Sequence, residues 1–154
     1  MHLFSKFDIP RISEQIVAGT YNVFMAVPTI YVKLIQYFEG IEEEEVQKIC
    51  GGFNAMRLNI SGSAACPVKL FKQWKELTGQ VLLERYGMTE IGMGISNPYN
   101  GERRAGAVGQ PLPGVECQLF DEDDNPVVNE TFSGEIRIKG CLLYTSPSPR
   151  DNSG

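Results

Sequence analysis

The sequence predicts an α/β protein in which βαβ units form a mostly parallel sheet, followed by a small antiparallel β segment. Apolar strand patterns alternate with helical ones, giving strand, helix, strand, helix and strand within ~65 residues, as parallel sheets require. After residue 90 glycine and proline become frequent. Two alternating patterns there flank an acidic turn, which is typical of antiparallel pairing.

Four helical patterns precede residue 80. Residues 9–19 have a proline near their start and a glycine at their end, and residues 29–38 follow a proline. The acidic residues 42–45 favour a third helix, because carboxylates suit its positive N-terminal end, and Gly51-Gly52 is expected to stop it. A fourth helix is capped by Gly79. The apolar faces comprise Ile30, Tyr31, Leu34, Ile35 and Phe38 on the second helix, and Leu70, Phe71, Trp74 and Leu77 on the fourth.

Five segments are predicted strands. Residues 21–27 and 56–60 are rich in apolar strand formers, and the first of these is predicted to be a buried strand. Residues 81–84 begin with a short buried run. Residues 115–120 and 135–139 alternate around the acidic turn. The first three strands are expected to be parallel and the last two antiparallel.

Composition excludes several classes of function. The chain has 154 residues, of which 42% are hydrophobic and 21% charged, an ordinary globular balance. Its net charge of -5 does not indicate the excess of basic residues on which nucleic-acid binding depends. No apolar run reaches the ~18 residues of a membrane span. Four scattered cysteines and one histidine lack metal-site spacing, so we expect reduced thiols and an intracellular protein, cytoplasmic or mitochondrial.

The segment 141–154 differs from the rest of the chain. It is rich in serine and proline and lacks periodicity, so it cannot extend the strand before it. It resembles a translated cloning adapter more than natural protein. A natural disordered tail is the alternative.

Two loops at strand ends carry the candidate binding groups. Residues 61–65 are all small, which lets backbone approach a flat ligand closely, although any tight turn between a strand and a helix favours small residues too. Residues 84–90 follow a buried strand and break at Gly87. Because the carboxyl ends of parallel strands share one edge, we expect both loops to flank one crevice.

The side chains of the second loop suit a nucleotide. Tyr86 can stack on a base, and Thr89 can donate to a phosphate oxygen. Glu90 can hold Mg²⁺, which prefers one or two carboxylates plus phosphate oxygens. No Gly-Lys-Ser/Thr follows a strand, so the site is not a Walker loop.

Four motifs in order resemble the adenylate-forming enzymes: acyl-CoA synthetases, luciferases and peptide-synthetase adenylation domains. Residues 84–90 (Glu-Arg-Tyr-Gly-Met-Thr-Glu) are similar to their Tyr-Gly-x-Thr-Glu motif, and residues 61–67 resemble their adenine-flanking loop. Residues 106–114 resemble their Gly-x-Val-Gly-x-Pro-x-Pro-Gly segment, and residues 134–140 their Gly-Glu-Ile/Leu strand. The resemblance covers residues 20–140.

The resemblance implies roles for individual residues. Thr89 and Glu90 would be catalytic, with Glu90 as the metal ligand. Met88 and Met93 would line the acyl pocket, although core filling explains a methionine equally well. The nucleotide-binding set would be Ser61, Gly62, Ser63, Ala64, Ala65, Tyr86, Gly87, Met88 and Thr89.

Arg85, together with residues 24–31, narrows the resemblance to malonyl-CoA synthetases. A guanidinium in an acyl pocket is costly unless an anion meets it. A dicarboxylic acid supplies one, because one carboxylate reacts with ATP while the other pairs with Arg85. Arg57 is a weaker candidate for the same role. The alternative for Arg85 is an ion pair with Glu84 or another surface acid.

The resemblance further implies a two-step reaction. ATP and malonate would give malonyl-AMP with the help of Mg²⁺, and coenzyme A would then displace AMP. The family's phosphate loop, ribose-binding aspartate and small lysine-bearing domain are absent, so we expect residues 1–140 to be the central part of the AMP-binding domain, incomplete at both ends and inactive alone. The alternatives are another short- or medium-chain acyl-CoA synthetase, or a non-catalytic nucleotide-binding module.

Overall fold

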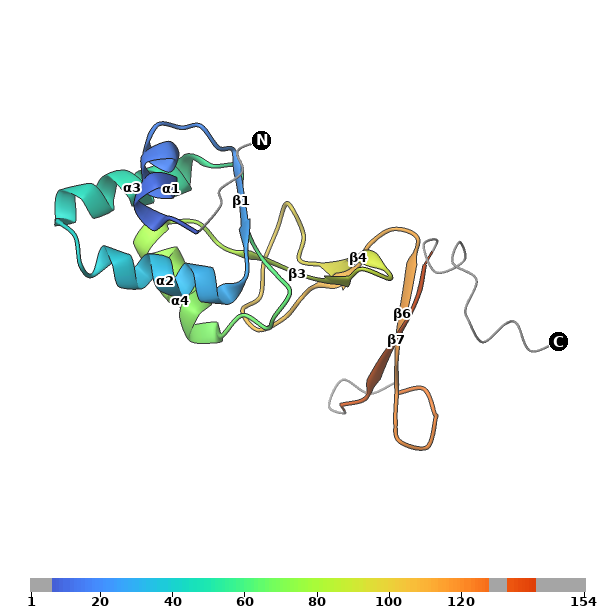
Figure 1. Ribbon diagram of the computed structural model, residues 1–154. Coiled ribbons are helices and arrows are strands. Elements are labelled where there is room, and N and C mark those ends of the chain that lie inside the picture. Colours follow the sequence, from blue (N-terminus) through green and yellow to red (C-terminus); the bar gives the residue numbers. More distant parts are fainter. Residues whose placement is uncertain (1–6, 128–132, 141–154) are drawn as a thin grey trace.

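The structure, a computed structural model, describes residues 7–127 and 133–140 (Figure 1). The predicted tail lies outside them. The helices of the described chain are α1 (Ile9–Val17), α2 (Pro28–Phe38), α3 (Glu43–Ala55) and α4 (Val68–Thr78). The strands are β1 (Val23–Ala26), β2 (Leu58–Ser61), β3 (Leu83–Met88), β4 (Gly92–Ser96), β5 (Gln110–Pro111), β6 (Val115–Phe120) and β7 (Glu135–Gly140).

The main sheet has the order β1-β2-β3-β4-β5 and changes direction at β3. Its first three strands are parallel, with Met25 opposite Ile60 and Ile60 opposite Leu83. From Arg85 onward β3 pairs antiparallel with β4, where Arg85 lies opposite Ser96. The parallel sheet predicted from the βαβ units is confirmed, and β4 and β5 extend it in the antiparallel sense. The prediction that the first strand is buried was wrong, because β1 lies at the edge of the sheet and Met25 is 52% exposed.

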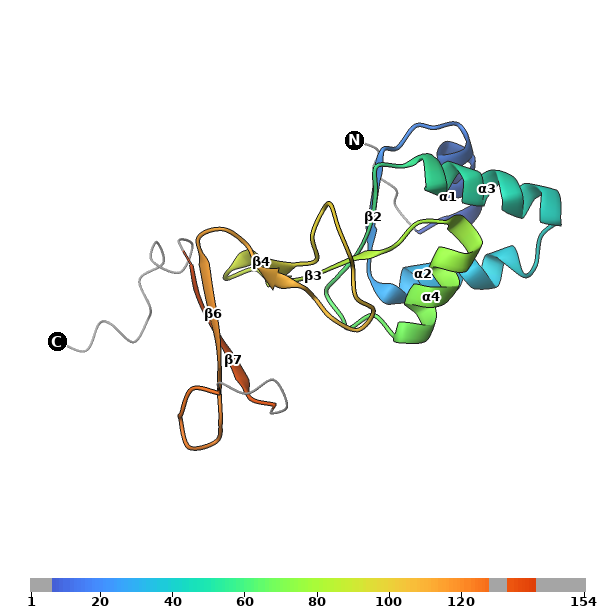
Figure 2. The same ribbon diagram turned by 180° about the vertical axis from the view of Figure 1, so that it is seen from behind.

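All four helices of the described chain lie on one side of β1 and β2 (Figures 1 and 2). Both crossovers, β1 to β2 and β2 to β3, move in the same direction across the sheet, and right-handed crossovers of that kind place their helices on one face. The core lies between helices and strands. There the Trp74 ring meets Tyr31 and Phe53 edge-on, with centroids 4.7 Å apart in each pair.

Hydrogen bonds join the helical layer to β2. The Asn59 side chain is fully buried, and its Oδ1 accepts a hydrogen bond from Trp74 Nε1 at 3.2 Å. Its Nδ2 donates to the carbonyl oxygen of Phe53 at 3.4 Å. The Tyr31 hydroxyl donates to the carbonyl oxygen of Ile60 at 2.7 Å. Buried polar groups of this kind are stabilising only when they are paired, as they are here.

Glycines 51 and 52 do not stop α3, contrary to the prediction. The helix runs through both to Ala55 and buries Phe53. A Cβ at Gly52 would lie 2.8 Å from Ile16, so this glycine lets α1 pack closely on α3. Packing therefore outweighs the roughly 1 kcal/mol that a glycine costs inside a helix.

The C-terminal cap and the apolar face of α4 agree with the prediction from the sequence, except for the side chain of Leu77. Gly79 has a left-handed φ of 75° and caps the helix as predicted. Trp74 is buried together with Leu70 and Phe71, whereas Leu77 is 39% exposed. Leu77 therefore lies at the margin of the predicted apolar face.

β3 runs further than predicted. It continues through Gly87 to Met88, with a register shift after Tyr86, and a turn at residues 89–91 leads into β4. A Cβ at Gly87 would overlap the carbonyl oxygen of Gly92, so the glycine permits close strand pairing. The prediction that the strand pattern breaks at Gly87 was therefore wrong.

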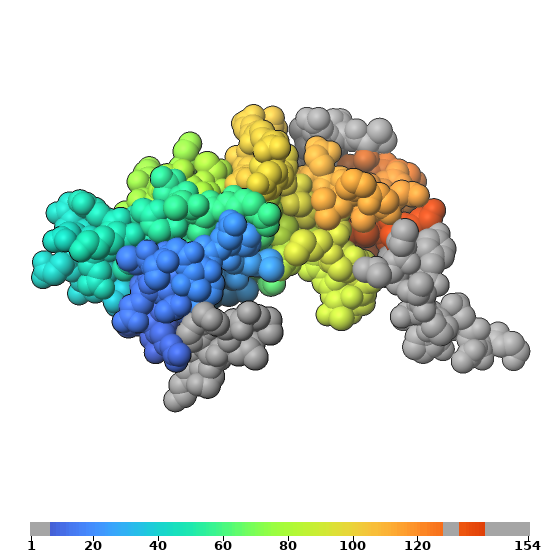
Figure 3. All heavy atoms as spheres, turned by 90° about the horizontal axis from the view of Figure 1, so that it is seen from above, coloured from blue at the N-terminus to red at the C-terminus, as the bar shows by residue number. Residues whose placement is uncertain are grey.

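The antiparallel pair β6–β7 confirms the second predicted segment. Val115 lies opposite Gly140 and Phe120 opposite Glu135. This hairpin stands away from the helical layer, which makes the described chain elongated (Figures 1 and 3). β3 and β4 lie between the two parts.

Candidate functional site

β3 directs two charged neighbours to different environments, because successive side chains of a strand point to opposite faces. Glu84 is 3% exposed, whereas Arg85 is half-buried beside the turn that follows β2. No ion pair found among the described residues joins Arg85 to a carboxylate. The alternative of a pair with Glu84 is therefore not what the structure shows.

Glu84 holds the loop before β5 against β3. Its Oε1 accepts a hydrogen bond from the Gly106 backbone N–H at 3.3 Å. The Asn97 side chain reinforces the contact, because its Nδ2 donates to the carbonyl oxygens of Glu84 at 3.3 Å and Ala107 at 2.5 Å. Burial raises the pKa of the Glu84 carboxyl, although backbone hydrogen bonds from Gly106 and Cys66 act in the opposite direction. Two of the sequence motifs, 84–90 and 106–114, are thereby joined.

The Arg85 guanidinium lies over the small-residue turn. A Cβ added at Gly62 would be 2.7 Å from its Nε and 2.8 Å from its Cζ. Nη2 donates to the sulfur of Met25 at 3.7 Å, while Nε is buried and has no hydrogen-bond partner among the described residues. A buried donor without a partner costs roughly 1–3 kcal/mol, so an anion that accepts from Nε would be favoured.

The predicted turn at residues 61–65 begins in the core and ends in solvent. Ser61 is 1% exposed at the end of β2, and the Gly62 N–H continues the ladder by donating to the carbonyl oxygen of Ala26 at 3.3 Å. Ser63, Ala64 and Ala65 are exposed.

The thiol of Cys66, directly after this turn, is buried. Burial and the charge of Glu84 raise its pKa to about 11. It is therefore a protonated, structural cysteine at neutral pH.

Residues 86–90 form one arm and the tip of the β3–β4 hairpin. Tyr86 is half-buried opposite Ile95, and Thr89 and Glu90 lie in the exposed turn. Met88 and Met93 are 46% and 48% exposed, so neither fills the core.

Arg57 lies apart from this cluster. It precedes β2, at the end opposite to residues 61–65, and its backbone N–H donates to the carbonyl oxygen of Asn22 at 2.9 Å. The two arginines considered for the same carboxylate are therefore not brought together.

Metal-ligand candidates are sparse in the described chain. It contains no group of three or more histidine, cysteine, aspartate or glutamate side chains that could hold an ion. A lone exposed carboxylate such as Glu90 fits Mg²⁺, which keeps several waters and takes further ligands from phosphate.

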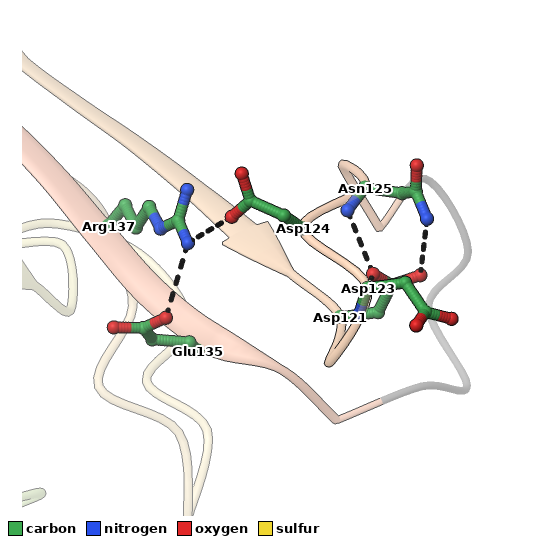
Figure 4. Close-up of polar contacts among 6 residues, drawn as sticks. All are labelled: Asp121, Asp123, Asp124, Asn125, Glu135 and Arg137. Carbon is green, nitrogen blue, oxygen red and sulfur yellow. Dashed lines mark hydrogen bonds and ion pairs between the residues drawn. The ribbon is translucent and has the colours of Figure 1, made fainter.

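A hollow of about 790 Å³ at the far end of the β6–β7 hairpin is lined by charged side chains, and Figure 4 shows the hydrogen bonds and ion pairs that several of them form with neighbouring residues. The Asp121 carboxylate accepts hydrogen bonds from the backbone N–H of Asn125 and from that of Asp123, and these bonds, the first above all, lower its pKa. Arg137 pairs with Asp124 and Glu135 and lies 4.1 Å from the Phe120 ring centroid. These contacts stabilise the turn.

Comparison with known proteins identifies the family of this chain. Residues 1–146 match the family described as AMP-binding enzyme. The chain belongs to this family. Within the family, the mitochondrial malonate–CoA ligase ACSF3 of Bos taurus is 45% identical over 166 residues, covering 91% of this chain and 28% of the relative. The probable CoA ligase CCL8 of Humulus lupulus is 44% identical over 123 residues, covering 80% and 20%.

Solved structures of family members share the fold. ATP-bound MatB from Rhodopseudomonas palustris gives a TM-score of 0.77 at 37% identity, covering 92% of this chain and 26% of that one. A malonyl-CoA ligase with methylmalonyl-CoA and AMP bound gives 0.74 at 31% identity, covering 90% and 28%. The chain thus spans about a quarter of the length of these proteins. Within its described part, no helix combines the length and apolar character needed to cross a membrane.

Three contributors to the site were not predicted from the sequence. Met25 approaches Arg85 from β1, and Asn97 and Gly106 fix the loop beside Glu84. Strand alternation, which places Glu84 and Arg85 on opposite faces, is the one signal that could have separated their roles. Met25 carries no such signal, because its contact spans sixty positions of sequence.

Proposed function

We propose that the protein carrying this chain is an AMP-forming acid–thiol ligase that activates malonate with ATP and transfers the malonyl group to coenzyme A. The observation that carries the proposal is the Arg85 guanidinium, which has a buried Nε without a partner and no carboxylate of the described chain to neutralise it. A ligand with a second carboxylate would meet both needs. The names of the bovine and human relatives, malonate–CoA ligases at 45% and 46% identity, support the same substrate.

The proposed reaction has two steps. One malonate carboxylate pairs with Arg85, and an oxygen of the other attacks the α-phosphorus of ATP, forming malonyl-AMP and releasing pyrophosphate. The thiol of coenzyme A then loses its proton to solvent, its sulfur attacks the carbonyl carbon of malonyl-AMP, and AMP leaves with the bonding electrons of the broken C–O bond.

In this proposal the residues of the chain bind and orient the substrates. Residues 61–65 flank the adenine, Tyr86 stacks on it, and Thr89 donates to the α-phosphate. Glu90 holds Mg²⁺, which when bound would offset phosphate charge. Met88 and Met93 border the acyl group. Arg57 has no part in it, because it lies at the other end of β2.

The surroundings of the enzyme are also part of the proposal. Its partners are small molecules, and its location is intracellular, in the mitochondrion or the cytoplasm. The bovine and human relatives, both named as mitochondrial, support this.

The test begins with the gene. The locus is sequenced upstream of Met1 and beyond Gly140, and its full-length product is assayed for pyrophosphate release with ATP, coenzyme A and malonate or propionate. We expect malonate to be strongly preferred, and Arg85→Met to remove that preference. Equal use of propionate would refute the dicarboxylate assignment in favour of another acyl-CoA synthetase. AMP binding without pyrophosphate release from any acid would refute the enzyme in favour of a nucleotide-binding module.

A further inference from the structure

We propose that Gly62 and Met25 form a seat for the Arg85 guanidinium, and that Gly62 is therefore a residue that determines selectivity for a dicarboxylic acid. The inference rests on the proposed function. It gives Gly62 a role toward the acid, whereas the family resemblance placed it only among the nucleotide-binding residues. Two neighbouring strands contribute the seat, because Met25 lies on β1 and Gly62 directly follows β2.

The first step of the argument is the space that Gly62 leaves. The three atoms nearest to an added Cβ all belong to Arg85: Nε at 2.7 Å, Cζ at 2.8 Å and Cδ at 3.1 Å. Real Cβ atoms do not approach other atoms so closely, so the guanidinium occupies the volume that any larger residue would fill.

The second step is that the backbone does not require glycine here. Gly62 is not among the residues with positive φ, unlike Gly79 or Gly106, so an alanine can adopt its conformation. The obstructing atoms lie on a long, flexible side chain rather than on backbone. Alanine at position 62 should therefore displace the guanidinium and leave the β1–β2 ladder intact.

The third step is the chemistry of Met25. Its sulfur is a weak acceptor, which positions Arg85 Nη2 at 3.7 Å without neutralising the charge. A carboxylate at this place would form an ion pair and compete with the ligand. The seat thus fixes the guanidinium while leaving its charge and its Nε–H for an anion.

The experiment uses the full-length protein that contains this chain. Steady-state kinetics are measured for Gly62→Ala, for Met25→Leu and for the control Gly51→Ala, which lies in α3 with no atom within 4 Å of an added Cβ. We expect Gly62→Ala to raise the KM for malonate about tenfold or more, a change well above that in the KM for ATP. Met25→Leu should raise the malonate KM less, and Gly51→Ala should change neither constant.

A double-mutant cycle isolates the contact. In an Arg85→Met background the guanidinium is absent, so Gly62→Ala should alter malonate kinetics by less than about twofold. If Gly62→Ala acts equally with and without Arg85, or raises the KM for ATP as much as that for malonate, the seat is refuted and Gly62 serves the nucleotide. Failure of the proposed function is a different result, because the unmutated protein itself would then show no preference for malonate over propionate.

Discussion

Replacing Asn59 with leucine should destabilise the chain because it strands a buried donor. The substitution leaves the fully buried Trp74 Nε1–H without its acceptor, and it removes one of the two hydrogen bonds that the carbonyl oxygen of Phe53 accepts. An unsatisfied buried donor costs about 1–3 kcal/mol, and the bulkier methyl groups of leucine add an overpacking cost in the same direction. With about 2–4 °C per kcal/mol for a chain of this length, we expect a fall in melting temperature of about 4–8 °C for a loss of 2 kcal/mol.

Urea unfolding followed by far-UV circular dichroism measures this free energy. The exposed Asn100→Leu is the matched control and should leave the midpoint unchanged. Trp74→Phe removes the donor itself, so the double variant Asn59→Leu/Trp74→Phe should cost less than the sum of the two single variants. Additive costs, or an Asn59→Leu variant as stable as the original chain, would show that the bond does not stabilise the fold.

Three further predictions follow from the site. Gly87→Ala should lower the unfolding midpoint, because its Cβ would overlap the Gly92 carbonyl oxygen, whereas Gly51→Ala should not; urea titrations compare the two. Glu84 has a raised pKa in the folded state, so the free energy of unfolding should fall as pH rises from its ordinary value of 4.5 through the raised one. Glu84→Gln should remove that part of the slope, and an unchanged slope would contradict the assignment. The Cys66 thiol, with a pKa of about 11, should react with a disulfide reagent at pH 8 only after unfolding; peptide mapping separates it from the half-buried Cys117, and fast labelling of Cys66 in the folded chain would disprove its burial.

Local patterns predicted most of the helical layer. The apolar period of residues 29–38 and the glycine after α4 were sufficient, because helix faces and left-handed caps are encoded within a few residues. Gly51-Gly52 was misleading because the deciding contact, Gly52 against Ile16, comes from another helix. β4 was not predicted, for a related reason. Its glycines lower its intrinsic strand propensity, and its pairing with β3 stabilises the strand instead.

The candidate site likewise has features that the sequence predicted and features that it did not predict. Arg85 beside the small-residue turn could be predicted, because parallel strands end at a common edge. The burial of Glu84, the bridge made by Asn97 and the approach of Met25 depend on where distant loops fold back. Such contacts leave no periodicity in the sequence, and only the three-dimensional arrangement reveals them.

The buried Trp74 has a practical consequence for following this chain in solution. It is the one tryptophan of the sequence, and its indole sits among Tyr31, Phe53 and Phe38 in the helical layer. Its fluorescence should emit at short wavelength and shift to the red only when that layer opens to water. The β6–β7 hairpin contains no tryptophan, so it could fray or dock onto another surface while the emission spectrum stayed constant. A single optical probe would therefore report one half of the molecule, and the other half needs a label of its own.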